Sequence, residues 1–386
     1  MHTVRVNRKG ANRIASGHPW IFSSDVLDRG QAGGGEAVVV VDPGGAALGT
    51  AHFSDSSQIT LRLLSDRVET IDRAFYLRRI AAAEAHRRRM VANSEAYRVV
   101  HGEGDQLPGL VIDRYGDYFT IQTLDQGMDS AKAEIVSCLE ELFAPLGIAE
   151  RNDAAVRKLE ALPLQSGVVA GEVPDTVPVR MNGLNLHADL LHGQKTGIFL
   201  DQRENYVAAA GYGRGRALDC FTSTGGFAMH LAGRCESVEA VDSSEVALRV
   251  ARMNCDANGI GNVELREADV FEVLAGHASA HRRFDIVVLD PPAFAKSRQS
   301  LEAAIRGYRE INRRALELLG SGGILVTCSC SHHLSEAELL EIVATASLDT
   351  GRKLRVLERR MQAQDHPVLL TVPETLYLKC LILEVI

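Results

Sequence analysis

The chain has 386 residues, of which 46% are apolar and 24% are charged, as in an ordinary globular protein. This length is too great for a single hydrophobic core, so we expect two or three domains. The sequence has no run of eighteen apolar residues and no apolar segment of the kind that secretion signals carry, so we expect neither a membrane span nor export. The seven cysteines are scattered, which favours reduced thiols and a cytoplasmic location.

The net charge of −8 argues against a protein coated with basic residues, although a local basic patch would suffice to bind nucleic acid. Basic residues cluster in two segments, one from Arg5 to His18 and one from Arg78 to Arg89. The simplest interpretation of each segment is a solvated face.

Residues 1–70 predict a small β-rich domain. Residues 38–42 and 47–53 form a hairpin around the turn PGG, and residues 58–64 alternate as a strand does. Residues 16–26 are expected to form a loop. Its tryptophan, Trp20, is interpreted as a core anchor, with stacking on a base as the alternative.

Residues 71–177 predict a small central α/β domain. A helical stretch over 70–91 is followed by three strands within 97–124, a helix over 130–142 and a strand over 148–151. The segment 165–179 is rich in glycine, proline and valine, so we expect a domain junction there.

From residue 178 to residue 386 the pattern changes to alternating strands and helices. Strands are expected over 218–221, 237–242, 263–269, 284–290 and 322–331, and helices over 226–233, 244–257, 300–319 and 335–347. Such alternation predicts an α/β fold with a doubly wound parallel sheet. The last run, 377–386, is expected to pair with 356–362 as an antiparallel edge of this sheet.

The first strand of this last domain ends in a turn of small residues. Asp219 closes the strand, and the sequence CFTSTGG follows before a helix opens at Phe227. Glycines let a ligand approach the backbone, and a helix start offers free N–H groups. The G-x-G-x-x-G order and the Lys-Ser/Thr pair of a P-loop are both missing, so an adenosine ligand with an amino-acid tail fits better than a dinucleotide.

Four acids recur at the carboxyl ends of predicted strands: Asp219, Asp242, Asp269 and Asp290. In a doubly wound sheet these ends line one crevice. One such acid usually caps a loop, but four in register with the glycine turn indicate a ligand site. Asp242 has the spacing at which a carboxylate meets ribose hydroxyls, and Asp269 is placed to accept a hydrogen bond from an adenine amino group.

Asp290 also opens the run DPPAF. Its two prolines fix the backbone and leave carbonyl groups without local donors, and Phe294 could stack on a flat ring. These features suit the binding of a base, and the alternative is a stiff connection between a strand and a helix.

The strand over 322–331 ends in TCSCS, which is expected to point Cys328 and Cys330 the same way. A zinc site would need more ligands than the neighbouring His332 and His333 provide. The two cysteines are therefore an inert buried pair or the source of a nucleophile. A thiolate here can add to carbon 6 of a pyrimidine, so that carbon 5 accepts a methyl group from a sulfonium donor. Loss of the carbon-5 proton and of the thiolate completes the cycle, with Asp290 holding the base edge.

These motifs together resemble a known family. HGQKTGIFLDQRENY (192–206), DCFTSTGGF, VDSS, EADVF, LDPPAF and SCS are similar to the S-adenosylmethionine-dependent large-subunit rRNA cytosine-5 methyltransferases of the RlmI type. The resemblance covers nearly the whole chain. It implies an N-terminal PUA domain that binds RNA, a central α/β domain and a C-terminal class I, Rossmann-like methyltransferase domain.

The resemblance implies S-adenosyl-L-methionine as cofactor and RNA, expected to be large-subunit rRNA, as partner. With the motifs above, the cofactor-binding residues are expected to be Phe199, Asp201, Gln202, Arg203, Asp219, Cys220, Phe221, Thr222, Gly225, Gly226, Asp242, Ser243, Asp269 and Asp290. The substrate-binding residues are expected to be Lys195, Pro291, Pro292 and Phe294.

The nucleophile is expected to be Cys330, with Cys328 as the alternative because the wider RNA cytosine-5 group has T-C-S in this motif. That group has Pro-Cys where this chain has Pro-Ala-Phe, so the base that removes the carbon-5 proton is unassigned. Two other functions stay open: methylation of a base nitrogen without an adduct, and RNA binding or ribosome assembly without catalysis. No metal is expected, and a homodimer is left open.

Overall fold

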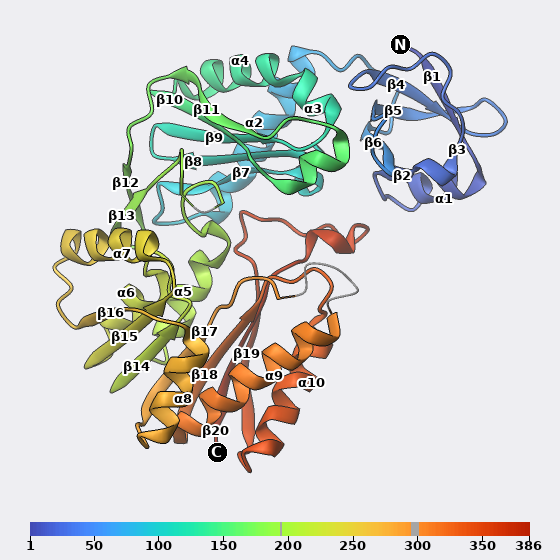
Figure 1. Ribbon diagram of the computed structural model, residues 1–386. Coiled ribbons are helices and arrows are strands. Elements are labelled where there is room, and N and C mark those ends of the chain that lie inside the picture. The colour runs from blue at the N-terminus through green and yellow to red at the C-terminus, as the bar shows by residue number, and fades with distance from the viewer. Residues whose placement is uncertain (194, 295–300) are drawn as a thin grey trace. The chain divides into compact units, whose positions relative to one another are not determined.

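The computed structural model describes residues 1–193, 195–294 and 301–386 (Figure 1). The chain forms two compact units. The first comprises residues 1–183, 188–200 and 364–375, and the second comprises residues 184–187, 201–363 and 376–386. Each unit is therefore built from segments that are far apart in the sequence.

The N-terminal part of the first unit is a six-stranded sheet in the order β2-β6-β5-β4-β1-β3. Its elements are β1 (Thr3–Val6), α1 (Arg8–Ala15), β2 (Trp20–Phe22), β3 (Val26–Asp28), β4 (Ala37–Val41), β5 (Ala47–Phe53) and β6 (Ile59–Ser65). The predicted hairpin is confirmed, because β4 and β5 pair antiparallel. The predicted loop over 16–26 is wrong in part: Trp20–Phe22 pair with β6, and Ile21 is fully buried in the core. The Nε1 atom of Trp20 donates to Glu103 Oε1 at 2.8 Å.

The central part of the first unit is a five-stranded sheet in the order β11-β10-β9-β8-β7. Its elements are α2 (Arg73–Met90), β7 (Ala96–His101), β8 (Leu110–Tyr115), β9 (Tyr118–Thr123), α3 (Gln126–Ser130), α4 (Lys132–Phe143), β10 (Gly147–Asn152) and β11 (Gln165–Gly171). The predicted helix, three strands, helix and strand are thus confirmed. The segment expected to hold a junction contains β11 and the start of β12 (Val177–Met181), and β12 pairs with β13 (Leu184–Ala188) in a two-stranded sheet.

The second unit is a seven-stranded sheet in the order β16-β15-β14-β17-β18-β20-β19. Its strands are β14 (Arg216–Cys220), β15 (Ser237–Asp242), β16 (Val263–Glu267), β17 (Phe284–Leu289), β18 (Leu319–Ser329), β19 (Leu354–Met361) and β20 (Lys379–Val385). Strands β14 to β18 are parallel, and β20 is antiparallel to both β18 and β19. The predicted doubly wound α/β sheet and its antiparallel last pair are confirmed.

Helices cover the sheet of the second unit (Figure 1). They are α5 (Arg203–Ala210), α6 (Gly226–Ala232), α7 (Glu245–Ala257), α8 (Val270–Ser279), α9 (Leu301–Leu318) and α10 (Glu336–Asp349). Helix α5 packs on α6, while α8, α9 and α10 share one hydrophobic core with β14, β17 and β18. This layering leaves the ends of the strands as the open edge of the sheet.

Some predictions for the second unit need correction. Helices α5 and α8 were not expected, although Val270, Val273, Leu274 and His277 repeat at helical spacing and form the buried face of α8. The last parallel strand was expected to run to residue 331, but β18 ends at Ser329. Cys328 therefore lies within the strand and Cys330 beyond its end, so the two thiols do not share one strand environment.

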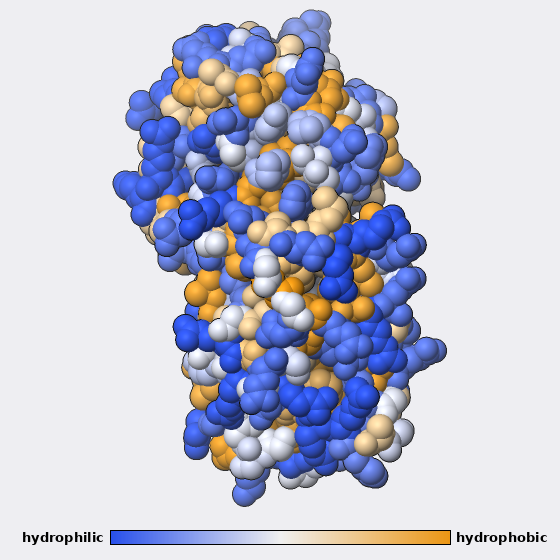
Figure 2. Space-filling view, turned by 90° about the vertical axis from the view of Figure 1, so that its left-hand side faces the viewer, coloured by the Kyte–Doolittle hydropathy of each residue, from blue (hydrophilic) through white to orange (hydrophobic). Residues whose placement is uncertain are grey.

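The surface offers no large apolar feature on the face that Figure 2 shows, where hydrophobic side chains are interspersed among hydrophilic ones. Single exposed apolar residues, such as Leu348 and Leu370, are normal for globular proteins. Within the described residues, no helix combines the length and the apolar character that crossing a membrane requires.

The second basic segment of the sequence is not wholly a solvated face, because Arg87 of α2 is completely buried. Its Nη2 atom donates to Asp105 Oδ2 at 2.7 Å and to the carbonyl oxygen of Asp365 at 2.8 Å. Asp365 in turn accepts from the backbone N–H of Arg98 at 2.8 Å. One buried guanidinium thus joins α2 to the segment 364–375 within the first unit.

We expect Arg87→Met to destabilise the first unit by about 3–5 kcal/mol, because it leaves the buried carboxylate of Asp105 without its cation. Arg89→Met, an exposed position two residues further along the same helix, should change stability by less than about 0.5 kcal/mol. Urea unfolding of both variants and of the parent measures the difference. Equal midpoints for the two variants would show that the buried pair is not needed.

Candidate active site

Backbone hydrogen bonds join the strand ends of the second unit beyond the sheet itself. The N–H of Thr222 donates to Val241 O at 3.0 Å, that of Ala268 to Asp242 O at 3.0 Å, and that of Asp290 to Cys220 O at 3.3 Å. The carboxyl ends of β14, β15, β16 and β17 are therefore held side by side. Their four acids, Asp219, Asp242, Asp269 and Asp290, stand along one edge of the sheet, as the sequence predicted.

The turn between β14 and α6 has an unusual backbone. Phe221, Ser223 and Gly225 have φ values of 64°, 49° and 87°, which lie in the left-handed region. Such a conformation costs about 1–3 kcal/mol for a residue with a side chain and is most often found at functional sites. It is held by Asp242 Oδ2, which accepts from the N–H of Ser223 at 2.9 Å.

Gly226 is required by the packing of Tyr206. A Cβ atom at Gly226 would lie 2.4 Å from the Tyr206 ring, which is too close for any side chain. Tyr206 is itself buried against Phe227 and His230, with ring centres 4.7 and 5.3 Å away. Tyr206 was not predicted as a site residue. It lies on α5, and its ring packs against the turn at Gly226.

Asp219 is completely buried below the turn. Its Oδ2 atom accepts from Thr222 Oγ1 at 2.5 Å and from the N–H of Ala228 at 2.9 Å. Within the described residues, its Oδ1 atom and the buried Oγ atom of Ser223 have no hydrogen-bond partner. Buried polar atoms are rarely left so, which indicates that a polar ligand completes this turn. An amino-acid tail or a ribose would fit these two atoms.

Burial, together with the nearby carboxylates of Asp290 and Asp242, raises the pKa of Asp219 to about 7. The Asp242 carboxylate accepts from the N–H groups of Ser223 and Ser244 at 2.9 Å each and is partly exposed. Asp269 is exposed and caps α8 by accepting from the N–H of Glu272 at 3.1 Å. Ser243 is exposed beside Asp242.

Asp290 is connected to the segment that precedes α5. Gln202 Nε2 donates to Asp290 Oδ1 at 3.0 Å, and Asn205 Nδ2 donates to Gln202 Oε1 at 2.7 Å. Asp201 Oδ2 accepts from the hydroxyl of Tyr377 at 2.8 Å, and the buried Arg203 donates to Glu204. Three residues that the resemblance assigned to the cofactor, Asp201, Gln202 and Arg203, are thus part of the second unit.

The two other predicted residues of this stretch, Lys195 and Phe199, belong to the first unit. There the Lys195 Nζ atom lies 4.5 Å from the centre of the Phe199 ring. Lys195 is exposed, and Phe199 is partly buried.

The two candidate thiols occupy different environments. Cys328 is completely buried opposite Cys380 in the β18–β20 pair, and burial together with its hydrogen bond to Cys380 raises its pKa well above the usual range. Cys330 is partly exposed beyond the end of β18. Cys220, at the end of β14, is completely buried, which also raises its pKa well above the usual range. Reactivity needs the thiolate, so Cys330 is the best placed of the three.

Tyr308 of α9 links Cys330 to the DPPAF run. Its hydroxyl accepts from Ser329 Oγ at 3.0 Å and lies 3.2 Å from Ser331 Oγ, so that it holds both neighbours of Cys330. Its ring centre lies 4.8 Å from that of Phe294. Sequence analysis missed Tyr308, because nothing local distinguishes it from other core positions of α9. Pro291 is buried and Pro292 is exposed.

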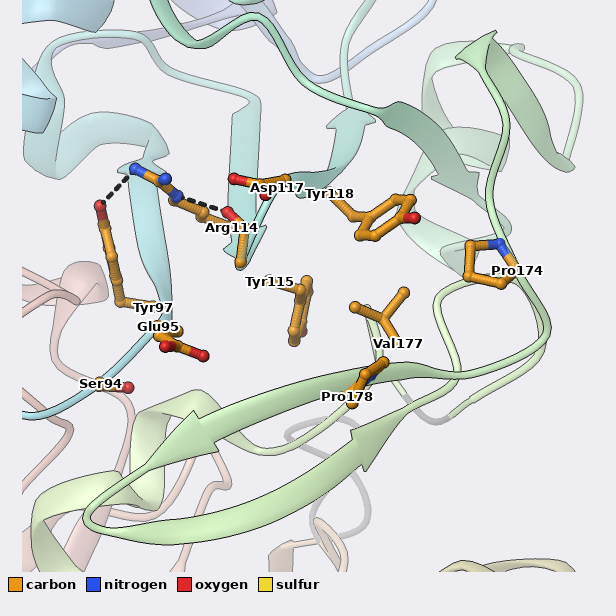
Figure 3. Close-up of a pocket in the computed structure, with 11 residues that line it drawn as sticks. Ser94, Glu95, Tyr97, Arg114, Tyr115, Asp117, Tyr118, Pro174, Val177 and Pro178 are labelled. Carbon is orange, nitrogen blue, oxygen red and sulfur yellow. Dashed lines mark hydrogen bonds between the residues drawn. The ribbon is translucent and has the colours of Figure 1, made fainter.

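The described residues include no group of three or more His, Cys, Asp or Glu side chains that could hold a metal ion. A separate pocket of about 580 Å³ lies in the first unit, beside β7, β8 and β9. Figure 3 shows Tyr118, Pro174 and Val177 on one side of it, with Arg114 donating to the Tyr97 hydroxyl on the other. The predicted site residues are not among the residues described as lining this pocket.

The raised pKa of Asp219 predicts a pH dependence of stability. Its carboxyl is neutral in the folded second unit up to about pH 7 but ionises near pH 4 when unfolded, so its contribution to stability is present below pH 4 and is lost as the pH rises to 7. Asp219→Asn removes this loss. We expect the variant to gain stability over the parent across this range, at about 1.4 kcal/mol for each pKa unit.

Urea unfolding of the second unit between pH 4 and 8 measures this difference. Asp256→Asn, a change at an exposed position on α7, serves as the control. Its free energy of unfolding should differ from that of the parent by the same amount at every pH. If the free energies of unfolding of Asp219→Asn and the parent differ by the same amount at every pH, Asp219 is ionised in the folded protein.

Comparisons with known proteins agree with this geometry. A family described as S-adenosylmethionine-dependent methyltransferase matches residues 150–381, and a PUA-like domain matches residues 4–66. A protein of Klebsiella pneumoniae named ribosomal RNA large subunit methyltransferase I is 42% identical over 371 residues, which cover 94% of this chain and 93% of that protein. The protein of the same name from Escherichia coli O157:H7 is 40% identical, with 94% of each chain covered.

Two solved structures share the fold over the full length of both chains. One is a methyltransferase complexed with SAH, with a TM-score of 0.86 and 22% identity. The other is an S-adenosylmethionine-dependent methyltransferase from Streptococcus mutans, with a TM-score of 0.84 and 21% identity. At such identities they establish the fold alone. The identity to the curated relatives goes further: the chain belongs to the ribosomal RNA large subunit methyltransferase I family, S-adenosylmethionine-dependent methyltransferases with an N-terminal PUA-like domain.

Proposed function

We propose that this chain transfers a methyl group from S-adenosyl-L-methionine to carbon 5 of a cytosine in large-subunit rRNA, through a covalent adduct with Cys330. The observation that carries the proposal is the contrast between the two thiols of the TCSCS run. Cys330 is partly exposed and is joined through Tyr308 to the DPPAF run, whereas Cys328 is completely buried beside Cys380. The printed names of the relatives support rRNA as the substrate.

When bound, the cofactor supplies an electrophilic methyl group on a sulfonium centre. The turn over 221–226 would hold its amino-acid tail, with backbone N–H groups and the unpartnered oxygens of Asp219 and Ser223 as ligands. Asp242 would accept hydrogen bonds from the ribose, and Asp269 from the adenine amino group. The remaining cofactor-binding residues of this proposal are Phe199, Asp201, Gln202, Arg203, Cys220, Phe221, Thr222, Gly225, Gly226, Ser243 and Asp290.

The target base would lie between Cys330 and the DPPAF run. Asp290 and the carbonyl groups before and after Pro291 would bind its polar edge, and Phe294 would stack on its ring, with Lys195 and Pro292 as further contacts. The Cys330 thiolate attacks carbon 6 and forms a carbon–sulfur bond, and the displaced electron pair makes carbon 5 nucleophilic. After methyl transfer the carbon-5 proton is removed and the carbon–sulfur bond breaks, which returns the thiolate.

Three domains would share this work in the cytoplasm: residues 1–70 bind RNA, residues 71–177 form the central domain, and residues 178–386 carry out methyl transfer. Exposed basic side chains at the start of the chain, Arg5, Arg8 and Lys9, support RNA binding by the first of these. We propose that no metal takes part.

We expect Cys330→Ala to reduce methyl transfer by about 10³-fold or more, because the reaction then lacks its nucleophile. Cys328→Ala, which removes a buried thiol two residues away, is the matched control and should keep the rate within about tenfold of the parent. Transfer is measured by mass spectrometry of nucleosides from large-subunit rRNA, supplied either as naked RNA or in partly assembled subunits. RNA that contains 5-fluorocytosine should trap a covalent complex with the parent and not with Cys330→Ala.

Full activity of the double variant Cys328→Ala/Cys330→Ala would contradict the adduct and favour methylation of a base nitrogen. Loss of activity in Cys328→Ala alone would assign the nucleophile to the buried thiol. Tight cofactor binding with no transfer to any RNA would favour a binding or assembly protein.

A further inference from the structure

A lysine begins the strand β20, whose next four residues are apolar. Lys379 is only 4% exposed, and the four residues that follow it, Cys380 to Leu383, are buried core residues. A buried ammonium is costly unless an anion or several hydrogen bonds compensate for its desolvation. Its position therefore calls for a partner.

The ammonium lies beside the Cys330 segment. In the β18–β20 pair Ser329 is opposite Lys379, and Lys379 Nζ donates to the carbonyl oxygen of Ser331 at 2.7 Å. That carbonyl is its hydrogen-bond acceptor within the described residues, so two of its three N–H donors are not used there. Cys330 stands between the two residues that Lys379 faces.

The other charged groups around Lys379 have partners of their own. From α10, Glu336 pairs with Arg359 of β19, and Glu338 accepts from the backbone N–H and hydroxyl of Ser335. From α9, the hydroxyl of Tyr308 is engaged with Ser329 and Ser331. Burial lowers the pKa of Lys379 to about 8, and Cys330 opposes this lowering more than Glu338 or Glu336 does.

Cys328 does not share this lysine. It is opposite Cys380, one residue along from the Ser329–Lys379 pair, and successive side chains of a strand point to opposite faces of the sheet. Lys379 and Cys328 are therefore on opposite faces. The two thiols therefore differ in their position relative to Lys379, and only the Cys330 segment lies beside its ammonium.

We propose that Lys379 is a positioning residue whose ammonium holds Cys330 as the thiolate that attacks the base. This inference rests on the proposed function, since it assigns the activation of the same nucleophile. The Cys330 proton passes to solvent, and Lys379 keeps its own proton and compensates for the negative charge on sulfur. A cationic neighbour lowers a thiol pKa below its ordinary value of about 8.5 and so raises the thiolate fraction at neutral pH.

The test follows the alkylation of Cys330 by iodoacetamide against pH in the full-length protein without RNA, read by mass spectrometry of the Cys330 peptide. We expect Lys379→Met to move the midpoint of this profile upward by at least about one pH unit, which lowers the rate at pH 7 about tenfold. Lys379→Arg keeps the cation and should keep the profile within about half a unit of the parent. Lys353→Met, an exposed lysine of the same unit, is the matched control and should leave the profile unchanged.

Methyl transfer gives a second measurement. We expect Lys379→Met to lower the rate about 10–100-fold at pH 7 and to recover towards the parent as the pH rises to 9, because hydroxide then ionises the thiol without help. A loss that is the same at every pH would mean that the lysine is merely structural and would overturn the inference. Unchanged alkylation in a folded Lys379→Met protein would overturn it as well.

The two measurements separate this inference from the proposed function. If Lys379→Met shifts the Cys330 profile but Cys330→Ala still transfers methyl groups, the lysine contact stands and the adduct mechanism fails. If Cys330→Ala is inactive and Lys379→Met behaves as the parent, the mechanism stands and the role of Lys379 fails.

Discussion

The pairing of β14 with β15 on one side and β17 on the other is the constraint on which the second unit depends. The chain leaves β14 towards β15 and β16, then returns to the opposite side of β14 for β17 and β18. At such a reversal the connections diverge, and the carboxyl ends of the central strands are left open to a ligand. The hydrogen bonds from Thr222, Ala268 and Asp290 to the neighbouring strand ends fix this edge, so the turn and the acids have fixed places.

The edge is costly to form. Phe221 and Ser223 adopt left-handed backbone conformations, and a carboxyl is buried at Asp219. These features persist because their surroundings fix them: the Tyr206 ring occupies the space where a side chain at Gly226 would lie, and Asp242 accepts from the N–H of Ser223. Stability elsewhere in the sheet offsets this cost, which is the usual condition of a preorganised site.

Elements with strong periodicity were predictable from the sequence, and so was the parallel sheet they form. The exceptions have local causes. The strand β2 has only three residues, and α8 begins so soon after β16 that its N-cap residue, Asp269, was included in the predicted strand. The acids and the glycine turn were predictable because they lie in short motifs. Tyr206, Tyr308 and Lys379 were not, because their contacts join residues that are 20 to 48 positions apart.

The antiparallel direction of β20 explains how a residue near the C-terminus reaches the thiol. In a parallel sheet, only the carboxyl ends of the strands and the turns that follow them reach the active edge. In this chain those segments contain small residues and acids. An antiparallel strand beside β18 begins where β18 ends, which sets Lys379, the first residue of β20, opposite Ser329. Its side chain can thus bring a positive charge to an edge that is otherwise lined by Asp219, Asp242, Asp269 and Asp290. A thiolate mechanism is favoured by such a charge, because a cationic neighbour stabilises the ionised form of a thiol.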